Sequence, residues 1–301
     1  MNLDLDLDGG EVRITNPDKV LYPGRPGEPP VTKREHVEYH AAIAPWMLPY
    51  LRGRAVNLHR YPDGAHRKGF WHKERPDFAP DFVKGWHYEE ADADETQCYA
   101  VLENVAAVAW VANFGAIEIN PWTSCTSAPH EPSWALVDID PGPATTFADV
   151  VDLARLYRAA LDHLDVRSCP KVTGKRGIQV WVPIAGGYTF DDTRAWVETI
   201  SRAIGSMRPE LVSWAWQKRD REGKARLDYT QNAINKTLVS PFSTRPMPGA
   251  TVSMPITWDE LDDGDLAPDR WTIRDVFDRV EDAGDPLAPL VGVQQPLPPI
   301  T

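Results

Sequence analysis

The most constraining stretch of this sequence is segment 134–141, an apolar run that ends in two aspartates and a proline. A run of this length and composition predicts a buried β-strand. Because side chains alternate along a strand, Asp138 and Asp140 share one face while Val137 and Ile139 pack on the other. Two carboxylates among buried neighbours are costly unless a cation compensates them. The pair therefore predicts a site for a hard divalent cation such as Mg²⁺ or Mn²⁺.

The Asp-x-Asp pattern is also expected by chance in an acidic chain. It recurs at 4–6, 6–8, 92–94 and 263–265, in polar or glycine-rich surroundings where solvated carboxylates are expected. Only the pair at 138 and 140 ends an apolar run, which favours a metal site there. The pair alone leaves polymerase, nuclease, phosphatase and glycosyltransferase chemistry open.

Composition limits the class of protein. A chain of 301 residues with 42% hydrophobic content can bury one large core or two modest ones. A net charge of −12 argues weakly against a nonspecific coat on nucleic acid, although much of the acid lies near the two ends. Three cysteines without Cys-x-x-Cys spacing indicate reduced thiols. With no apolar run near 20 residues and no signal peptide, we expect a cytoplasmic protein without a membrane segment.

Strand and helix patterns alternate along the chain and predict an α/β (α+β) fold. A capping box at Thr32 predicts a helix to about Ala44. Further helices are expected at 104–115, 146–164 and 189–207, and strands at 12–14, 116–120, 178–184 and 225–230. We predict an acidic lead at 1–10 (flexible or an edge strand), a single catalytic domain at 11–285 and a Pro-rich tail at 286–301.

Three further features carry candidate chemistry. Phe70 and Trp71 lie in a basic run, the composition of a surface that stacks bases and follows a phosphate backbone, although core packing explains them equally well and a strand would turn one of them inward. The loop 171–177 combines lysine and arginine with glycines, which suits phosphate binding without being a Walker A motif. Asp228 is a third acid in a predicted strand.

In this order, the features resemble the polymerase domain of the bacterial end-joining DNA ligase D and its stand-alone mycobacterial primase-polymerase relatives, in the archaeo-eukaryotic primase superfamily. The resemblance spans nearly the whole chain. Its most specific motifs are Val137–Gly142, the 173–179 loop, and Asp228–Asn232 with Lys236-Thr237. The resemblance implies a primase-type catalytic domain with mixed or antiparallel sheets flanked by helices.

The resemblance also implies roles for individual residues. Asp138, Asp140 and Asp228 match the catalytic carboxylates that hold two Mn²⁺ or Mg²⁺ ions. The implied nucleotide-binding residues are Phe70, Trp71, Asn120, Thr173, Lys175, Arg176, Gln179, Gln231 and Arg245. Asn16, Lys19 and Lys33 match a pocket for the 5′-phosphate of a downstream DNA strand. The implied activity is template-directed polymerisation of NTPs or dNTPs at gaps or ends in DNA repair, with ribonucleotides favoured.

The sequence departs from the family pattern at three positions. Asn120 and Gln179 stand where family members have histidine, and His59 stands where a lysine is expected. Asparagine and glutamine still donate hydrogen bonds but carry no charge, so we expect triphosphate affinity either to be weaker or to be redistributed onto Lys175. All three carboxylates are retained.

Two rival functions stay open. A metal-dependent nuclease could use the same acids, and a non-catalytic module could keep the 5′-phosphate pocket and bind DNA ends or gaps without turnover. The expected partners are gapped or 5′-phosphorylated DNA and nucleotides, with Ku or a separate ligase as further candidates, and we expect a monomer.

Overall fold

The computed structural model describes residues 2–92 and 95–300. The Asp-x-Asp copy at 92–94 therefore lies partly outside the described residues, as do the first residue of the predicted lead and the last residue of the tail. The chain forms two compact units. Unit 1 comprises Met1–Ser127, Thr237–Ser253 and Trp271–Glu281, and unit 2 comprises Ala128–Lys236, Met254–Arg270 and Asp282–Thr301. The predicted boundaries at 10 and 285 stay a prediction.

Unit 1 is built on an antiparallel sheet in the order β6-β5-β8-β7, with β9 also paired to β5. Two helices, α1 (Lys33–Leu51) and α2 (Val105–Asn113), pack against each other. The sheet strands are β5 (Ala55–Arg60), β6 (Phe70–His72), β7 (Lys84–Asp92), β8 (Glu95–Val101) and β9 (Ala116–Pro121). The smaller strands are β1 (Leu3–Leu7), β2 (Gly10–Ile14), β3 (Val20–Tyr22), β4 (Val31–Thr32) and β10 (Ser124–Cys125).

The N-terminal lead is an ordered hairpin of β1 and β2. Its apolar side chains pack with α1 and α2 in one buried cluster: Val12, Ile14, Val37, Ala106, Ala109 and Ala112, with Leu3, Leu5 and Leu7 alongside. The alternation of Asp and Leu therefore encodes a half-buried strand, which is one of the two predicted alternatives.

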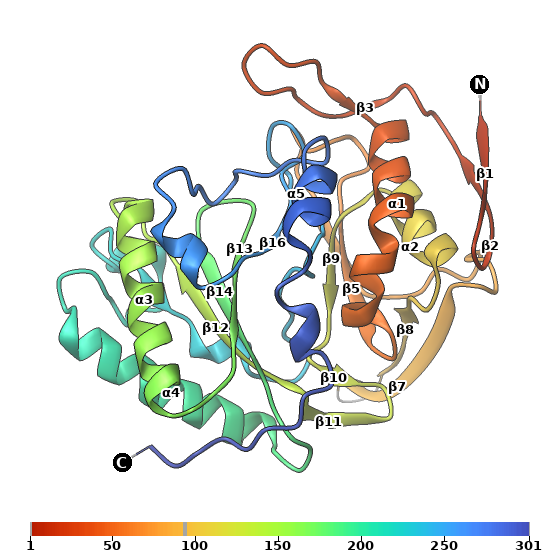
Figure 1. Ribbon diagram of the computed structural model, residues 1–301. Coiled ribbons are helices and arrows are strands. Elements are labelled where there is room, and N and C mark those ends of the chain that lie inside the picture. The colour runs from red at the N-terminus through yellow and green to blue at the C-terminus, as the bar shows by residue number, and fades with distance from the viewer. Residues whose placement is uncertain (1, 93–94, 301) are drawn as a thin grey trace. The chain divides into compact units, whose positions relative to one another are not determined.

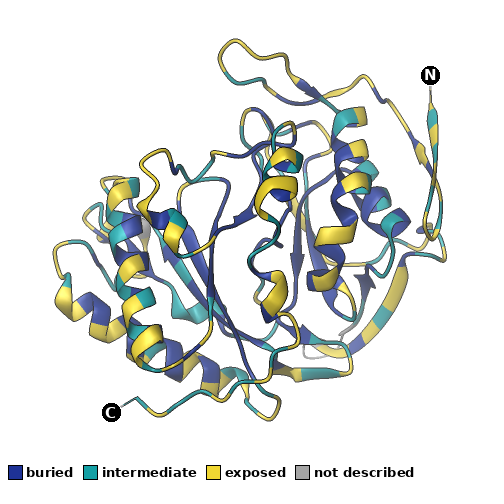
Figure 2. Ribbon diagram, in the orientation of Figure 1, coloured by how far each residue is buried: buried dark blue, intermediate teal, exposed yellow. Residues whose placement is uncertain are grey.

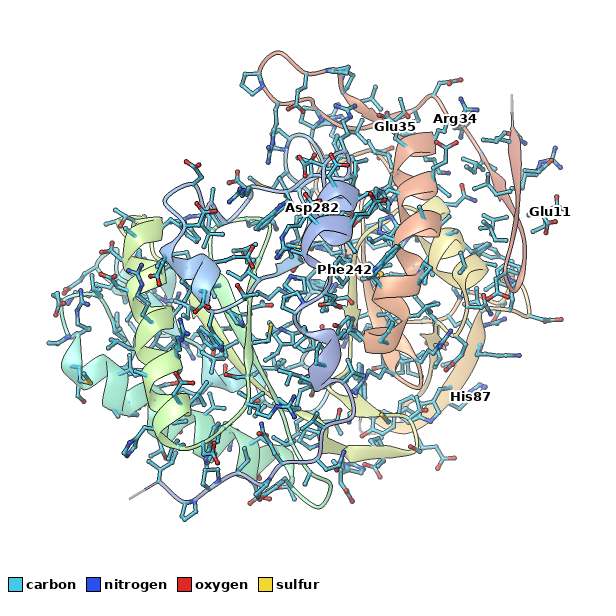
Figure 3. All side chains as sticks on the ribbon, viewed as in Figure 1. Glu11, Arg34, Glu35, His87, Phe242 and Asp282 are labelled. Carbon is cyan, nitrogen blue, oxygen red and sulfur yellow. The ribbon has the colours of Figure 1, made fainter. Side chains whose placement is uncertain are left out.

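Helix α1 begins at the predicted capping box, in which Thr32 and Glu35 bond each other's backbone N–H. Figure 3 labels Glu35 in the first turn of this helix. Its predicted end near Ala44 is wrong, because the helix continues to Leu51 through Pro45 and Pro49. Each proline removes a backbone donor. The last two turns bury Met47, Leu48, Tyr50 and Leu51, and this packing offsets the missing bonds.

Unit 2 is built on an antiparallel five-strand sheet in the order β15-β12-β14-β13-β16, with helices α3 and α4 packed together and against it (Figure 1). The predicted strand 134–140 is its β12. Figure 2 shows the inner strands as mostly buried. The elements are β11 (Ala128–Pro132), β12 (Trp134–Asp140), α3 (Phe147–His163), β13 (Cys169–Val172), β14 (Ile178–Pro183), α4 (Phe190–Met207), β15 (Arg226–Leu227) and β16 (Met254–Pro255). Helix α5 (Val276–Ala283) contains residues of both units.

The predicted strand at 225–230 is much shorter in the structure. Only Arg226–Leu227 pair as β15, and a 3₁₀ turn follows at Tyr229–Gln231. Asp228 caps this turn, because its carboxylate accepts from the backbone N–H of Thr230 at 3.1 Å. Aspartate side chains compete with strand pairing in this way.

Within the described residues, no helix combines the length and the apolar character that spanning a bilayer requires. Cys98, Cys125 and Cys169 are free thiols.

Candidate active site

The acid pair lies at the end of β12, on one face of the unit 2 sheet. Val137 and Ile139 are 2% and 0% exposed, whereas Asp138 and Asp140 are partly exposed. The predicted alternation is therefore confirmed. On one side β12 pairs with β14, where Asp138 lies opposite Gln179, and on the other with β15, where Asp140 lies opposite Arg226.

A backbone hydrogen bond places the third acid, Asp228, next to Asp138. The N–H of Asp228 donates to the carbonyl oxygen of Asp138 at 2.7 Å, directly after the short pairing of β15 with β12. The charge of Asp228 also raises the pKa of the Asp138 carboxyl. Three acids from separate parts of the sequence thus meet at one sheet edge.

Each acid has its own partner within unit 2. Gln179 Nε2 donates to Asp138 Oδ1 at 3.1 Å. Arg221 Nη1 donates to Asp140 Oδ2 at 2.8 Å, and Arg226 Nη2 lies 3.4 Å from Asp228 Oδ1. The two arginine side chains are only 7% and 6% exposed. Buried guanidinium groups therefore compensate part of the clustered negative charge.

The surroundings of Asp138 shift its pKa strongly. Burial raises the pKa of Asp138 to about 7, and the charges of Asp140 and Asp228 add to the rise. The hydrogen bond from Gln179 and the charge of Lys171 oppose it. Such a carboxyl is ready to exchange its proton for a nearby cation.

The three carboxylates suit a divalent metal ion by their chemistry, although their present positions do not form a closed metal site. Three carboxylates are the hard oxygen ligands that Mg²⁺ and Mn²⁺ prefer. However, nowhere in residues 2–92 and 95–300 do three or more His, Cys, Asp or Glu side chains converge closely enough to hold an ion. The chemistry of these residues fits the ions, and binding them requires the carboxylates to exchange amide and guanidinium partners for metal.

The predicted basic loop stands next to this edge. Thr173 Oγ1 accepts from the backbone N–H groups of Lys175, Arg176 and Gly177 at 3.1–3.3 Å, which fixes the turn. Arg176 Nη2 donates to the carbonyl of Gly142 at 2.6 Å. A Cβ at Gly177 would lie 2.5 Å from the carbonyl oxygen of Ile139, so only glycine allows this close approach of the loop to β12.

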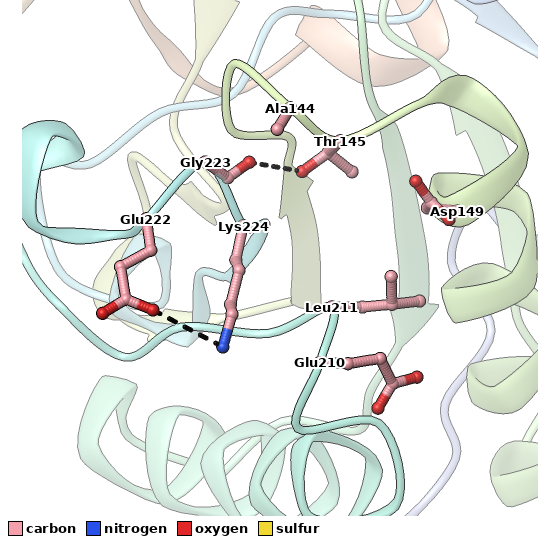
Figure 4. Close-up of a pocket in the computed structure, with 8 residues that line it drawn as sticks. All are labelled: Ala144, Thr145, Asp149, Glu210, Leu211, Glu222, Gly223 and Lys224. Carbon is pink, nitrogen blue, oxygen red and sulfur yellow. Dashed lines mark hydrogen bonds and ion pairs between the residues drawn. The ribbon is translucent and has the colours of Figure 1, made fainter.

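Gln231 belongs to the same cluster, since its Nε2 donates to Asp228 Oδ2 at 3.1 Å. Among the predicted site residues of unit 2, hydrogen bonds join Asp138 to Gln179 and Asp228, and join Asp228 to Gln231. Asp140 ends the same strand as Asp138, and Thr173, Lys175 and Arg176 lie in the loop whose Gly177 approaches β12. The pocket in Figure 4, lined by Thr145, Asp149, Glu210, Glu222 and Lys224 among others, contains none of them.

Unit 1 holds the predicted 5′-phosphate residues at the start of α1. The backbone N–H of Lys33 donates to the Lys19 carbonyl at 2.7 Å, and Asn16 turns the preceding loop with a φ of 52°. Lys33 Nζ donates to Thr15 Oγ1 at 3.0 Å. Burial, together with the charge of Lys19, lowers the pKa of Lys33 to about 8. Two crowded ammonium groups at a helix N-terminus suit an anion.

The aromatic pair lies on β6, the edge strand of the unit 1 sheet. Phe70 and Trp71 are 46% and 53% exposed, so the expectation that one of them faces inward is wrong. β6 is a strand of three residues at the edge of the sheet, paired with β5. One face of Trp71 stacks on His59, with ring centroids 4.6 Å apart and planes 7° apart. His59 thus orients the indole.

Glu118, a buried glutamate of unit 1 that was not predicted as a site residue, contacts two of the residues discussed above, Arg245 and His59. Glu118, 4% exposed, accepts from Arg245 Nε at 2.7 Å and contacts His59 Nδ1. Asn120, on the same strand, donates from Nδ2 to the Asn57 carbonyl at 3.3 Å. A single acid inside the apolar segment 116–120 was the available signal for Glu118. No such signal distinguished Arg221 and Arg226 from other charges in their segment.

Comparison with known proteins agrees with this geometry. Residues 32–287 match the family described as "LigD, primase-polymerase domain". The bifunctional non-homologous end joining protein LigD of Bacillus subtilis is 31% identical over 92% of this chain and 44% of its own length. The multifunctional LigD of Mycolicibacterium smegmatis is 32% identical over 93% of this chain and 36% of its own. The chain therefore spans less than half of the length of these relatives.

A solved structure shares the fold. The polymerase domain of Mycobacterium tuberculosis ligase D in complex with DNA superposes with a TM-score of 0.84 at 26% identity, covering 94% of this chain and 99% of that one. The predicted fold class is thereby confirmed. The family match over most of the sequence shows that this chain belongs to the LigD primase-polymerase domain family.

Proposed function

We propose that this chain is a DNA-directed nucleotidyltransferase that adds nucleotides to a primer at short gaps or broken ends, in repair by non-homologous end joining or excision. Family membership supports nucleotidyl transfer in general. The single observation that carries the proposal is the meeting of Asp138, Asp140 and Asp228 at the β12–β15 edge. Polymerisation is supported over the rival nuclease by relatives named for end joining and by a structural neighbour solved with DNA.

In this proposal Asp138, Asp140 and Asp228 would hold two Mn²⁺ or Mg²⁺ ions, which supply Lewis-acid activation of a 3′-hydroxyl and neutralise charge on a triphosphate. The protein's own part is to release these carboxylates from Gln179, Arg221 and Arg226. The freed guanidinium groups stay beside the site, where they can pair with phosphate oxygens.

The remaining candidates receive the substrates. In unit 2, Thr173, Lys175, Arg176, Gln179 and Gln231 would contact the incoming nucleotide. In unit 1, nucleotide binding is proposed for Phe70, Trp71, Asn120 and Arg245, and 5′-phosphate binding for Asn16, Lys19 and Lys33. Ribonucleotides are the favoured substrates in this proposal, because the family resemblance implies them.

We also propose the cellular setting. The chain would act as a monomer in the cytoplasm, on gapped or 5′-phosphorylated DNA, together with a Ku-like end binder or a separate ligase. Relatives named for non-homologous end joining and the absence of a bilayer-spanning helix among the described residues support this setting.

The decisive experiment is primer extension on a gapped duplex with a 5′-phosphate, using each combination of NTP or dNTP with Mn²⁺ or Mg²⁺. We expect extension by the wild type, strongest with NTP and Mn²⁺, and none by Asp138→Ala. Shortening of the labelled primer would identify a nuclease. Phosphate-dependent binding without incorporation under any condition would identify a non-catalytic end-binding module.

A further inference from the structure

The most exposed aromatic side chain of unit 2 among the described residues is Trp216, in the segment between α4 and β15. Trp216 is 68% exposed, more than the 53% of Trp71. Tryptophan is seldom left this open to solvent, because its large apolar surface favours burial. An exposed indole that is also fixed in position is a candidate binding surface.

The backbone of Trp216 is fixed by an arginine of the acid cluster. Arg221 Nη2 donates to the carbonyl oxygen of Trp216 at 3.2 Å, and its Nε donates to that of Ala215 at 3.1 Å. The same guanidinium donates to Asp140 at 2.8 Å. The position of Trp216 is therefore tied to one of the proposed catalytic acids.

The indole ring is fixed by a second arginine of that cluster. Arg226 Cζ lies 4.5 Å from the centroid of the Trp216 ring, in a cation–π contact. Arg226 also pairs with Asp228. The two arginines that hold Trp216 are thus the ones that pair with Asp140 and Asp228.

This arrangement leaves one aromatic face for a ligand. One face of the indole rests on a guanidinium, and more than half of the side chain is exposed, so the opposite face is open to solvent. A planar ring is the group that stacks best on such a face. Nucleic-acid strands present planar bases together with phosphates, and the exposed Arg219 in the same segment, which lies 3.6 Å from Asp220, has a guanidinium that can pair with a phosphate.

We propose that Trp216 is a stacking platform for a base of a nucleic-acid strand, held beside the acid trio by Arg221 and Arg226. This inference rests on the proposed function, because it identifies the strand's base as a ligand of the same edge of unit 2. Trp216 belongs to unit 2, whereas the predicted pair Phe70 and Trp71 belongs to unit 1.

Binding without chemistry tests this inference. We would measure fluorescence anisotropy of a short labelled thymidine oligonucleotide and of an abasic strand of equal length, without metal, on the full chain. Loss of one stacked base should weaken binding of the thymidine strand to Trp216→Ala by about tenfold. Binding of the abasic strand should not change, and Trp216→Phe should keep most of the wild-type affinity.

Met207→Ala is the matched control, because Met207 is also in unit 2 and is 65% exposed. It should bind both strands like the wild type. The proposal is overturned if Trp216→Ala weakens both strands equally, if it weakens neither, or if the wild type does not prefer the strand with bases. Reduced UTP binding with unchanged strand binding would also overturn it, since the base would then be the nucleotide's. Gap extension by the wild type, measured in parallel, tests the proposed function separately.

Discussion

Like charges are crowded together at two places: at the acid trio of unit 2 (Asp138, Asp140 and Asp228) and, with opposite sign, at the lysine corner of unit 1 (Lys19 and Lys33). Both crowd like charges into a partly buried place, and in both the pKa of one group moves toward neutrality: that of Asp138 upward to about 7, that of Lys33 downward to about 8. The difference lies in the partners. The acids are paired with the guanidinium groups of Arg221 and Arg226.

The lysines have weaker compensation. Lys33 Nζ donates to the neutral hydroxyl of Thr15, and Lys19 Nζ donates to the Pro62 carbonyl, with the exposed Asp63 at 3.5 Å. The lysine corner is thus prepared to receive an anion as it stands. The acid trio must exchange internal partners before it receives cations. Ligand affinity should therefore respond to mutation in different ways at the two places.

The largest expected effect is that of Asp138→Asn. The Asp138 pKa is higher in the folded state than its ordinary 3.8, so the folded protein binds more protons between about pH 4 and 7, and the wild type loses stability as pH rises through this window. Asn removes the buried charge. At pH 8 we expect the metal-free variant to be more stable than the wild type by about 1–2 kcal/mol, after a discount for solvent screening.

Thermal or urea unfolding at pH 5 and pH 8 measures this effect. The gain should shrink at pH 5, and stabilisation by added Mn²⁺ should disappear. Asp191→Asn is the control, because the Asp191 side chain is 85% exposed in the same unit. If Asp138→Asn were less stable than the wild type at pH 8, the ionised Asp138 carboxylate would not destabilise the metal-free fold, and the prediction would be wrong.

A smaller effect is expected at the lysine corner. Lys33→Met should reduce the preference for 5′-phosphorylated over 5′-hydroxyl DNA by about tenfold, since one charged hydrogen bond is lost. The wild type should lose the same preference as pH rises through about 8, where Lys33 gives up its proton. Binding of both gapped duplexes from pH 7 to 9.5 measures this.

Arg13→Met is the control for this change, because it removes a charge from a 67% exposed side chain of the same unit. It should preserve the phosphate preference. A preference that survives in Lys33→Met would move the 5′-phosphate to another part of the chain.

The smallest effect is expected at Lys171, which is 0% exposed. Lys171 lies opposite Gln179 in the β13–β14 pair, and Gln179 lies opposite Asp138, so its charge reaches the trio across one strand. Lys171→Met removes a cation that competes with a bound metal. We expect Mn²⁺ to bind severalfold more tightly, and the metal-free protein to melt at a lower temperature.

Calorimetric Mn²⁺ titration checks this prediction. Arg194→Met, which removes an exposed positive charge from unit 2, should leave the affinity unchanged. Weaker Mn²⁺ binding in Lys171→Met would show that the lysine supports the metal site through structure alone.

The amino-acid sequence by itself determined the local features of this protein. The strand with Asp138 and Asp140 on one face and the capping box at Thr32 follow from side-chain alternation and from helix capping. These features depend on residues a few positions apart, so the amino-acid order contains the information. Family motifs added the third acid.

Only the tertiary structure decided the features that depend on distant contacts. Packing carries α1 through two prolines, and both Phe70 and Trp71 are exposed on the edge strand β6. Strand pairing brings Arg226 and Gln179 to the acids, and the turn before β15 brings Arg221. A charged residue looks the same in the sequence whether it faces solvent or a buried carboxylate. Its partner, and hence its role, is set by which strands lie side by side.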